Sequence, residues 1–136
     1  MRKIEHLGIA VKDLNTSSML YAKLLNTLPY KEEIVESEQV STLFFKTGET
    51  KIELLQALDP SSAIAKFIEK RGEGIHHIAF EVDDIYSEIK RLKEEGFVLL
   101  SDTPKRGADN KMIVFLHPKS SGGVLVELCQ EIKESE

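Results

Sequence analysis

The sequence is poor in cysteine, has no long apolar run and carries no excess of basic residues. Its single cysteine, Cys129, excludes an internal disulfide framework and a zinc site of the CxxC type. No apolar stretch approaches the roughly 18 residues of a membrane-spanning helix, and the first residues lack the apolar core of a signal peptide. The net charge of −5 argues against broad nucleic-acid binding, although not against a small anionic ligand. We therefore expect a cytoplasmic protein.

The composition is that of one soluble globular domain, with 136 residues of which 41% are hydrophobic and 30% charged. Hydrophobic periodicity and turn residues predict alternating strands and helices. Helices are predicted after the capping residue Asp13, at about 61–71, and between the cap Asp84 and the stop Gly96. Strands are predicted at 4–11, 30–36, 40–47, 50–57, 75–82, 97–100, 112–117 and 123–129.

An internal repeat is the main organisational signal. The run that begins at His6 parallels the run that begins at His77 at an offset of 71 residues, and Glu53 parallels Glu127 at an offset of 74. Two matches in the same order indicate a duplication. We therefore predict an α+β fold of one domain, 1–136. It would consist of two tandem β-α-β-β-β modules, with bounds of about 3–58 and 74–130 and a linker helix at about 61–71.

The repeated histidines lie on the less bulky face of their strands. Strand alternation places His6 beside Gly8 and Ala10, and His77 beside Ala79, opposite the bulky apolar residues. Bulky residues are expected to pack against helices, so the small ones leave space above the sheet. We expect a ligand to occupy that space.

The repeated glutamates stand in otherwise apolar strands. A lone buried carboxylate costs several kcal/mol unless it is paired or coordinated, so Glu53 and Glu127 are expected to share a partner. Two imidazoles and two carboxylates form a ligand set that suits cobalt, nickel, zinc, manganese or iron. Such a set leaves two adjacent positions of an octahedral ion open for a substrate that binds through two oxygens. Each residue taken alone has a simpler explanation. A strand histidine is more often structural, and Glu53 alone would more often pair with a lysine such as Lys51.

Three other residues with reactive side chains are expected to have structural roles. His76 should face the helix side of its strand, and His117, which precedes Pro118, fits a surface position. Cys129 is most simply a small core residue.

Five stretches resemble the vicinal oxygen chelate superfamily, and within it the methylmalonyl-CoA epimerase family. The resemblance covers nearly the whole chain, and the HHI and HPKS…GVLVEL runs are the most specific to the epimerase branch. The stretches begin at His6 (HLGIAV), Lys51 (KIELL), Gly74 (GIHHIAFEVD), Phe115 (FLHPKS) and Gly123 (GVLVEL).

The resemblance implies a site and a reaction. It implies one divalent metal ion per chain, with cobalt first and zinc, nickel or manganese as alternatives, held by His6, His77 and Glu127. Glu53 occupies the fourth position, which is Gln or Glu among relatives. The implied reaction inverts the carbon between the thioester and the free carboxylate of methylmalonyl-CoA. The family also implies that the modules close into a cup-shaped mixed sheet and that two chains form a homodimer.

The catalytic base is the point where the sequence departs from the family pattern. The expected carboxylate position falls on Ser37. A one-residue slip or a bulge would let Glu38 take the role, and Glu36 is the second candidate. The resemblance implies Glu127 as the group that donates a proton to the opposite face of the substrate. We assign Glu127 mainly as a metal ligand.

Basic residues of the second half are candidates to bind the phosphates of coenzyme A. They are Lys105, Arg106, Lys111 and Lys119, and a solvated surface explains each of them equally well. Two other functions stay open: glyoxalase I, a lyase that acts on the hemithioacetal of glutathione, and a non-enzymatic binding protein of the same fold. An intact set of four ligands argues against the second, because binding members commonly lack it.

Overall fold

The computed structural model describes residues 1–133 and divides into two compact units. One unit runs from His6 to His76, and the other contains Met1–Glu5 together with the chain from His77 onward. The final part of the predicted 1–136 domain, residues 134–136, lies outside the described residues. Within residues 1–133, no helix is both long enough and apolar enough to cross a membrane.

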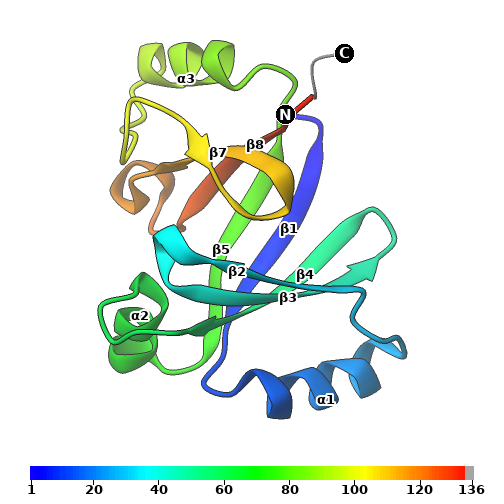
Figure 1. The fold of residues 1–136 in the computed structure, drawn as a ribbon. Coiled ribbons are helices and arrows are strands. Elements are labelled where there is room, and N and C mark those ends of the chain that lie inside the picture. The colour runs from blue at the N-terminus through cyan, green and yellow to red at the C-terminus, as the bar shows by residue number, and fades with distance from the viewer. Residues whose placement is uncertain (134–136) are drawn as a thin grey trace. The chain divides into compact units, whose positions relative to one another are not determined.

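The unit that begins at His6 is built on strands in the order β2-β3-β4-β1 (Figure 1). β1 is parallel to β4, and the other neighbours are antiparallel. The elements are β1 (Lys3–Ala10), α1 (Leu14–Leu25), β2 (Lys31–Val35), the 3-10 turn η1 (Glu36–Glu38), β3 (Val40–Thr47), β4 (Thr50–Ala57) and α2 (Ala63–Arg71).

Helix α1 forms because apolar residues recur at helical spacing behind Asp13. Leu14, Tyr21 and Leu25 pack with Phe45 on the sheet face that β3 and β4 present to the helix. This packing is the one that the spacing predicts, and it leaves the other sheet face for the small residues of β1.

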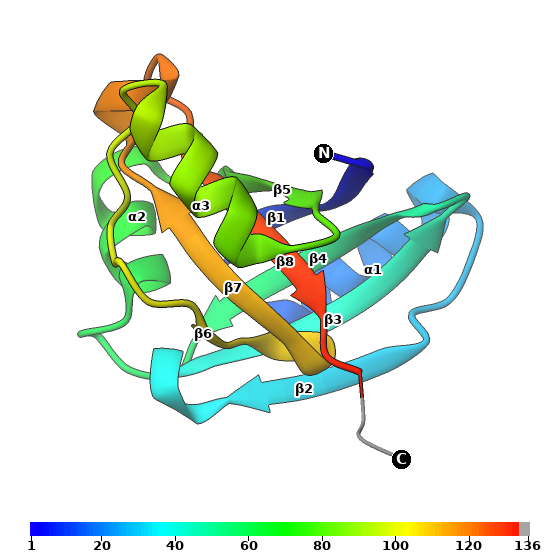
Figure 2. The same cartoon turned by 90° about the horizontal axis from the view of Figure 1, so that it is seen from above.

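The other unit repeats this architecture with strands in the order β5-β8-β7-β6. β5 is parallel to β8, and β7 is antiparallel to both of its neighbours. Figure 2 shows α3 lying over this sheet, where it buries Ile85, Ile89 and Leu92 against Val114 and Leu128. The elements are β5 (Gly74–Glu81), α3 (Ile85–Glu94), β6 (Lys105–Arg106), η2 (Ala108–Asn110), β7 (Lys111–Leu116), η3 (Pro118–Ser121) and β8 (Val126–Glu131).

The prediction of a strand at 97–100 is wrong. Only Leu99 forms a bridge, to Leu116 of β7, after which the chain bends and reaches Pro104, which has no backbone N–H to continue a ladder. The edge of this sheet is instead β6, only two residues long.

The last strand also begins later than predicted. Gly122 and Gly123 have φ angles of 69° and 91°, a backbone that favours glycine and forms a turn. β8 therefore starts at Val126, where the predicted strand was 123–129. The strands predicted at 40–47 and 50–57 form a hairpin, in which Thr47 pairs with Thr50 and Gly48 has a φ of 62°.

The helix that follows the first strand of each module has an aspartate cap, as predicted. Asp13 accepts a hydrogen bond from the Thr16 amide, and Asp84 accepts one from the Ser87 amide. Hydrogen bonds from the side chains of Thr16 and Ser87 lower the pKa of Asp13 and Asp84, respectively. Because the folded-state pKa is depressed, each cap stabilises the fold while it is ionised. That contribution is lost as the pH falls through the folded-state pKa.

In each module, a glutamine of the last strand also accepts a hydrogen bond from the first turn of the module's helix. The Oε1 atom of Gln56 accepts from the Leu14 amide at 2.6 Å, and Oε1 of Gln130 accepts from the Ile85 amide at 2.7 Å. A first-turn amide has no partner within its own helix. The two glutamines therefore tie the end of β4 to α1, and the end of β8 to α3.

We predict that Gln130→Met lowers the free energy of unfolding by about 1 kcal/mol, because the Ile85 amide loses its acceptor. Urea denaturation followed by circular dichroism measures this change. Gln130→Glu is the matched control, since it keeps an acceptor oxygen at the helix N-terminus and should cost less. Equal losses in the two variants would contradict the role of the hydrogen bond.

Candidate metal ligands and active-site residues

Two of the four predicted ligands, His6 and Glu53, are in contact in the unit that begins at His6. Nδ1 of His6 lies 3.0 Å from Oε2 of Glu53, and the two residues are only 5% and 4% exposed. The parallel register of β1 and β4 sets Gly8 beside Glu53, and the antiparallel register sets Phe44 on its other side. Since Gly8 has no side chain, the carboxylate has room to reach the imidazole.

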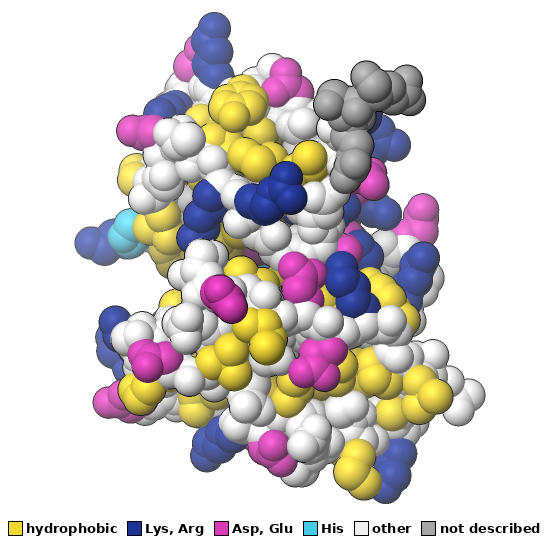
Figure 3. All heavy atoms as spheres, viewed as in Figure 1, with side chains coloured by type: hydrophobic (Ala, Val, Ile, Leu, Met, Phe, Trp, Pro, Cys, Tyr) yellow, Lys and Arg dark blue, Asp and Glu magenta, His cyan; other side chains and the backbone are white. Residues whose placement is uncertain are grey.

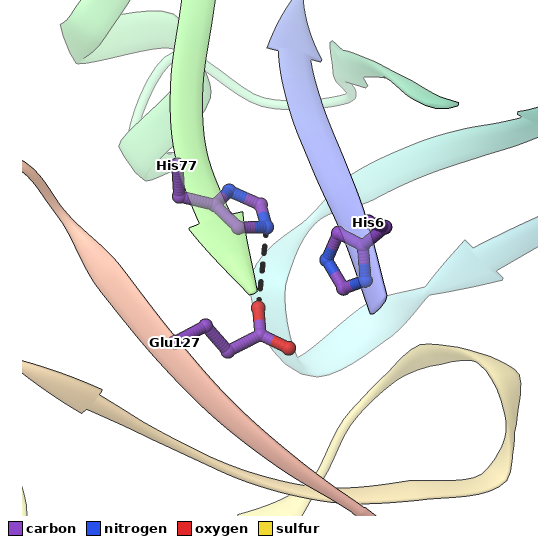
Figure 4. Close-up of side chains that lie close together, drawn as sticks. All are labelled: His6, His77 and Glu127. Atoms are coloured by element: carbon purple, nitrogen blue, oxygen red, sulfur yellow. Dashed lines mark ion pairs between the residues drawn. The ribbon is translucent and has the colours of Figure 1, made fainter. Parts of the chain in front are cut away.

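The second pair repeats this arrangement in the other unit. Nε2 of His77 lies 3.2 Å from Oε1 of Glu127, and the two residues are 6% and 4% exposed. Figure 4 shows the two side chains reaching toward each other from β5 and β8. Ala79 lies beside Glu127 on one side and Phe115 on the other. The Phe115 ring stands edge-on to the His77 imidazole, with 5.6 Å between their centroids.

Each ligand pair therefore has the same frame, a small residue on the first strand and a phenylalanine on the middle strand. The small residues Gly8 and Ala79 are part of the predicted pattern. Phe44 and Phe115 were missed, although their offset of 71 residues equals that of the histidines. That equal offset is the signal that could have found them.

The donor chemistry of the two pairs fits a divalent metal ion. Each pair offers one imidazole nitrogen and carboxylate oxygens, and all four residues are more than nine-tenths buried. Nitrogen and oxygen donors of this kind suit first-row transition metals. Buried carboxylates are also expensive without a positive partner, and a cation would provide one.

Another buried carboxylate, Glu5, was not predicted. It is 2% exposed, next to His6 in the sequence. The signal that identified Glu53, an acid within an apolar strand, was present here too.

The candidate bases lie in the tight connection between β2 and β3. Glu36 and Glu38 are the ends of η1, and Gln39 then takes a left-handed conformation with a φ of 52°. The Gln39 side chain donates to the backbone oxygen of Glu36 at 2.8 Å. Glu36 is exposed and Glu38 is half-buried. The turn thus gives the two carboxylates different environments, and only Glu38 is partly withdrawn from water.

The three basic candidates lie on the surface of the second unit. Lys105 and Arg106 form β6, and Lys119 lies in η3; all three are exposed. Nη1 of Arg106 donates to the Asn110 side chain at 3.1 Å. Lys111 differs from them, because it is buried.

The residues that were read as structural have structural contacts. His76 lies edge-on to Phe67 of α2, with 5.1 Å between the ring centroids. Nδ1 of His117 accepts from the Lys119 amide at 3.1 Å and so caps η3. Cys129 is fully buried in a cluster with Ala79.

Comparisons with known proteins identify the family of this chain. Residues 5–115 match the family described as the Glyoxalase/Bleomycin resistance protein/Dioxygenase superfamily. The ethylmalonyl-CoA/methylmalonyl-CoA epimerase of Cereibacter sphaeroides is 43% identical over 130 residues, which cover 94% of this chain and 97% of the relative.

Two solved structures share the fold. The methylmalonyl-CoA epimerase of Mycobacterium tuberculosis matches with a TM-score of 0.91 and 37% identity, over 96% of this chain and 88% of that chain. A variant of the Streptomyces coelicolor methylmalonyl-CoA epimerase in complex with 2-nitronate-propionyl-CoA matches with a TM-score of 0.89 and 32% identity, over 100% and 99% of the two chains. The predicted fold class is thereby confirmed. The chain belongs to the glyoxalase superfamily and, within it, to the methylmalonyl-CoA epimerase family.

Proposed function

We propose that this protein is an isomerase that interconverts the 2R and 2S forms of methylmalonyl-CoA. The observation that carries the proposal is the repeated, buried His–Glu pair, one in each unit. Relatives with this activity that match nearly the whole chain support it. The reaction removes the proton from the carbon between a thioester and a carboxylate and returns a proton to the opposite face.

The proposed ligands of the metal are His6, Glu53, His77 and Glu127. Cobalt is the first candidate, and zinc, nickel or manganese are alternatives. When bound, a divalent cation would supply positive charge beside the two substrate oxygens that gain negative charge as the proton leaves. We infer that the two modules function as one domain, because each contributes half of these ligands.

The proton transfers are assigned to carboxylates of this chain. Glu38 is proposed as the base, since it is half-buried whereas Glu36 is exposed, and a general base must be withdrawn from bulk water to meet a bound substrate. Glu36 is the second candidate for this role. Glu127, in addition to its role as a ligand, is assigned the proton transfer on the opposite face.

Cationic side chains are proposed to hold the phosphates of the coenzyme. Lys105, Arg106 and Lys119 are exposed on the surface of the second unit. A cytoplasmic homodimer that acts on an acyl-CoA without nucleic acid or membrane partners completes the proposal.

Glyoxalase I is the second candidate function, because the same two His–Glu pairs suit a lyase of glutathione hemithioacetals. The HHI and HPKS runs and the glutamates of η1 favour the epimerase. A purely binding role is less well supported, because it gives no reason to bury two carboxylates with two imidazoles.

Incubation of the cobalt-loaded protein with racemic methylmalonyl-CoA in heavy water should exchange the C2 proton for deuterium. The expected exchange follows from proton removal at the carbon between the two carbonyl groups, and proton NMR measures it. Protein without added metal is the control. Turnover of the glutathione hemithioacetal with no exchange at C2 would instead identify a lyase.

His77→Ala should lower the affinity for Co²⁺ by about 100-fold or more, because one of four buried ligands is lost. Isothermal titration calorimetry measures the affinity, and C2 exchange should be lost as well. His76→Ala is the matched control, since its ring contacts Phe67 and not the Glu127 carboxylate. Retention of full metal affinity and activity in His77→Ala would refute the ligand assignment.

Glu38→Gln should lower kcat by about 10²–10⁴-fold, the usual contribution of a general base, and leave Co²⁺ affinity unchanged. Glu36→Gln, two residues away on the exposed side, should retain most of the activity. Stopped C2 exchange in the Glu36 variant with normal exchange in the Glu38 variant would reverse the assignment.

A further inference from the structure

A small hydrophobic cluster lies directly beside the second ligand pair, on the same face of the sheet. It consists of Ala79, Ile113 and Cys129, all of which are buried. Ala79 follows His77 by two positions on β5, and Cys129 follows Glu127 by two positions on β8. Because side chains two positions apart on a strand point to the same side, the cluster continues the face that carries the proposed chemistry.

The cluster occupies the closed side of this ligand pair. β8 begins only one residue before Glu127, after a turn through Gly122 and Gly123, so the face ends there. In the other direction the strands continue past the pair, and Ile113 lies opposite Cys129 in the β7–β8 register. A group that extends from the pair in this direction along the strands therefore meets buried apolar side chains.

Ile113 has the largest side chain of the cluster, and Gly107 packs closely against it. A Cβ atom at Gly107 would lie 2.7 Å from Cδ1 of Ile113 and 3.1 Å from both Cγ1 and Cγ2. The Gly107 amide also donates to the backbone oxygen of Lys111 at 2.9 Å, which fixes this segment on β7. Side chains in such tightly packed surroundings do not move aside without cost. Ile113 therefore forms a rigid wall next to the ligand pair.

We propose that Ile113, held in place by Gly107, limits the size of the alkyl group at C2 of the substrate. This inference rests on the proposed function and deepens it, because it names the substituent that the site selects. The reacting carbon belongs beside the His77–Glu127 pair, and Phe115 lies opposite Glu127. Two residues, the separation of Ile113 from Phe115, span about 7 Å along a strand. The side chain of Ile113 fills part of that length, so the wall admits a methyl group and opposes each further methylene.

The alkyl group is the part of the substrate that suits this cluster. The carboxylate and the thioester oxygen gain negative charge as the proton leaves, so they belong at the polar ligand pair. The surface of the molecule seen in Figure 3 mixes charged and apolar side chains, whereas the cluster is hydrophobic and buried. Transfer of an alkyl group from water to such a place is favourable.

The test is the ratio of the dissociation constants of ethylmalonyl-CoA and methylmalonyl-CoA, measured by calorimetry on the cobalt-loaded protein. The two ligands differ by one methylene, which a hydrophobic pocket discriminates by about 10–200-fold. Ile113→Ala should lower the ratio of the ethyl to the methyl constant by about tenfold or more, because the wall is removed. Gly107→Ala should raise it, because the added methyl group pushes Ile113 toward the ligand.

Val114→Ala is the matched control. Val114 is the neighbour of Ile113 on β7 and is also buried, but it packs on the other face, in the cluster with α3. Its loss should leave the ratio unchanged. An unchanged ratio in Ile113→Ala, or an equal change in Val114→Ala, would overturn the inference. Ile113→Val, which loses less packing, repeats the test if the Ala variant does not fold.

The outcome is separate from that of the C2 exchange experiment, because affinities are measured rather than turnover. Binding of both thioesters with the expected change of ratio, but without exchange at C2, would refute the proposed reaction alone. Exchange at C2 with an unchanged ratio would refute only the role of Ile113. Failure of both thioesters to bind would overturn the two proposals together.

Discussion

The buried contact between a histidine and a glutamate, made once in each module, is the interaction on which the rest of the structure depends. A carboxylate in an apolar strand would destabilise the fold by several kcal/mol without a partner. Gly8 and Ala79 leave space for the carboxylates, and Phe44 and Phe115 close the other side. These neighbours keep water away from the pair. The imidazole nitrogen and the carboxylate oxygens of each pair are donors that could bind a cation.

Much of the fold and the four candidate ligands could be predicted from the sequence, because the same residue types recur at the same place in two copies of one module. A single strand histidine carries little information. His6 and His77 at the same place in two copies, each followed by an aspartate cap, identify both the module and the face that matters. The pairing of His6 with Glu53, and of His77 with Glu127, follows from strand alternation once the parallel partners are known.

The parts that sequence reasoning missed depend on contacts between strands or on irregular backbone. Phe115 stands beside Glu127 because of the β7–β8 register, which the sequence indicates only through the 71-residue offset between Phe44 and Phe115. The burial of Lys111 has the same origin, since a lysine at a strand start reads as a surface residue. The segment 97–100 has the composition of a strand but forms only one bridge, because the chain must bend toward Pro104.

The two modules have diverged at their edge strands rather than at the ligand pairs. In the first, β2 has five residues and ends in η1 with its two glutamates. In the second, β6 has two residues, both basic, and leads through η2 to Lys111. One copy thus carries carboxylates that can accept a proton, and the other carries cations that can hold an anion. The proposed substrate has an acidic C–H bond and a distant phosphate and would use both, so under the proposed function the edge strands have specialised for one asymmetric ligand.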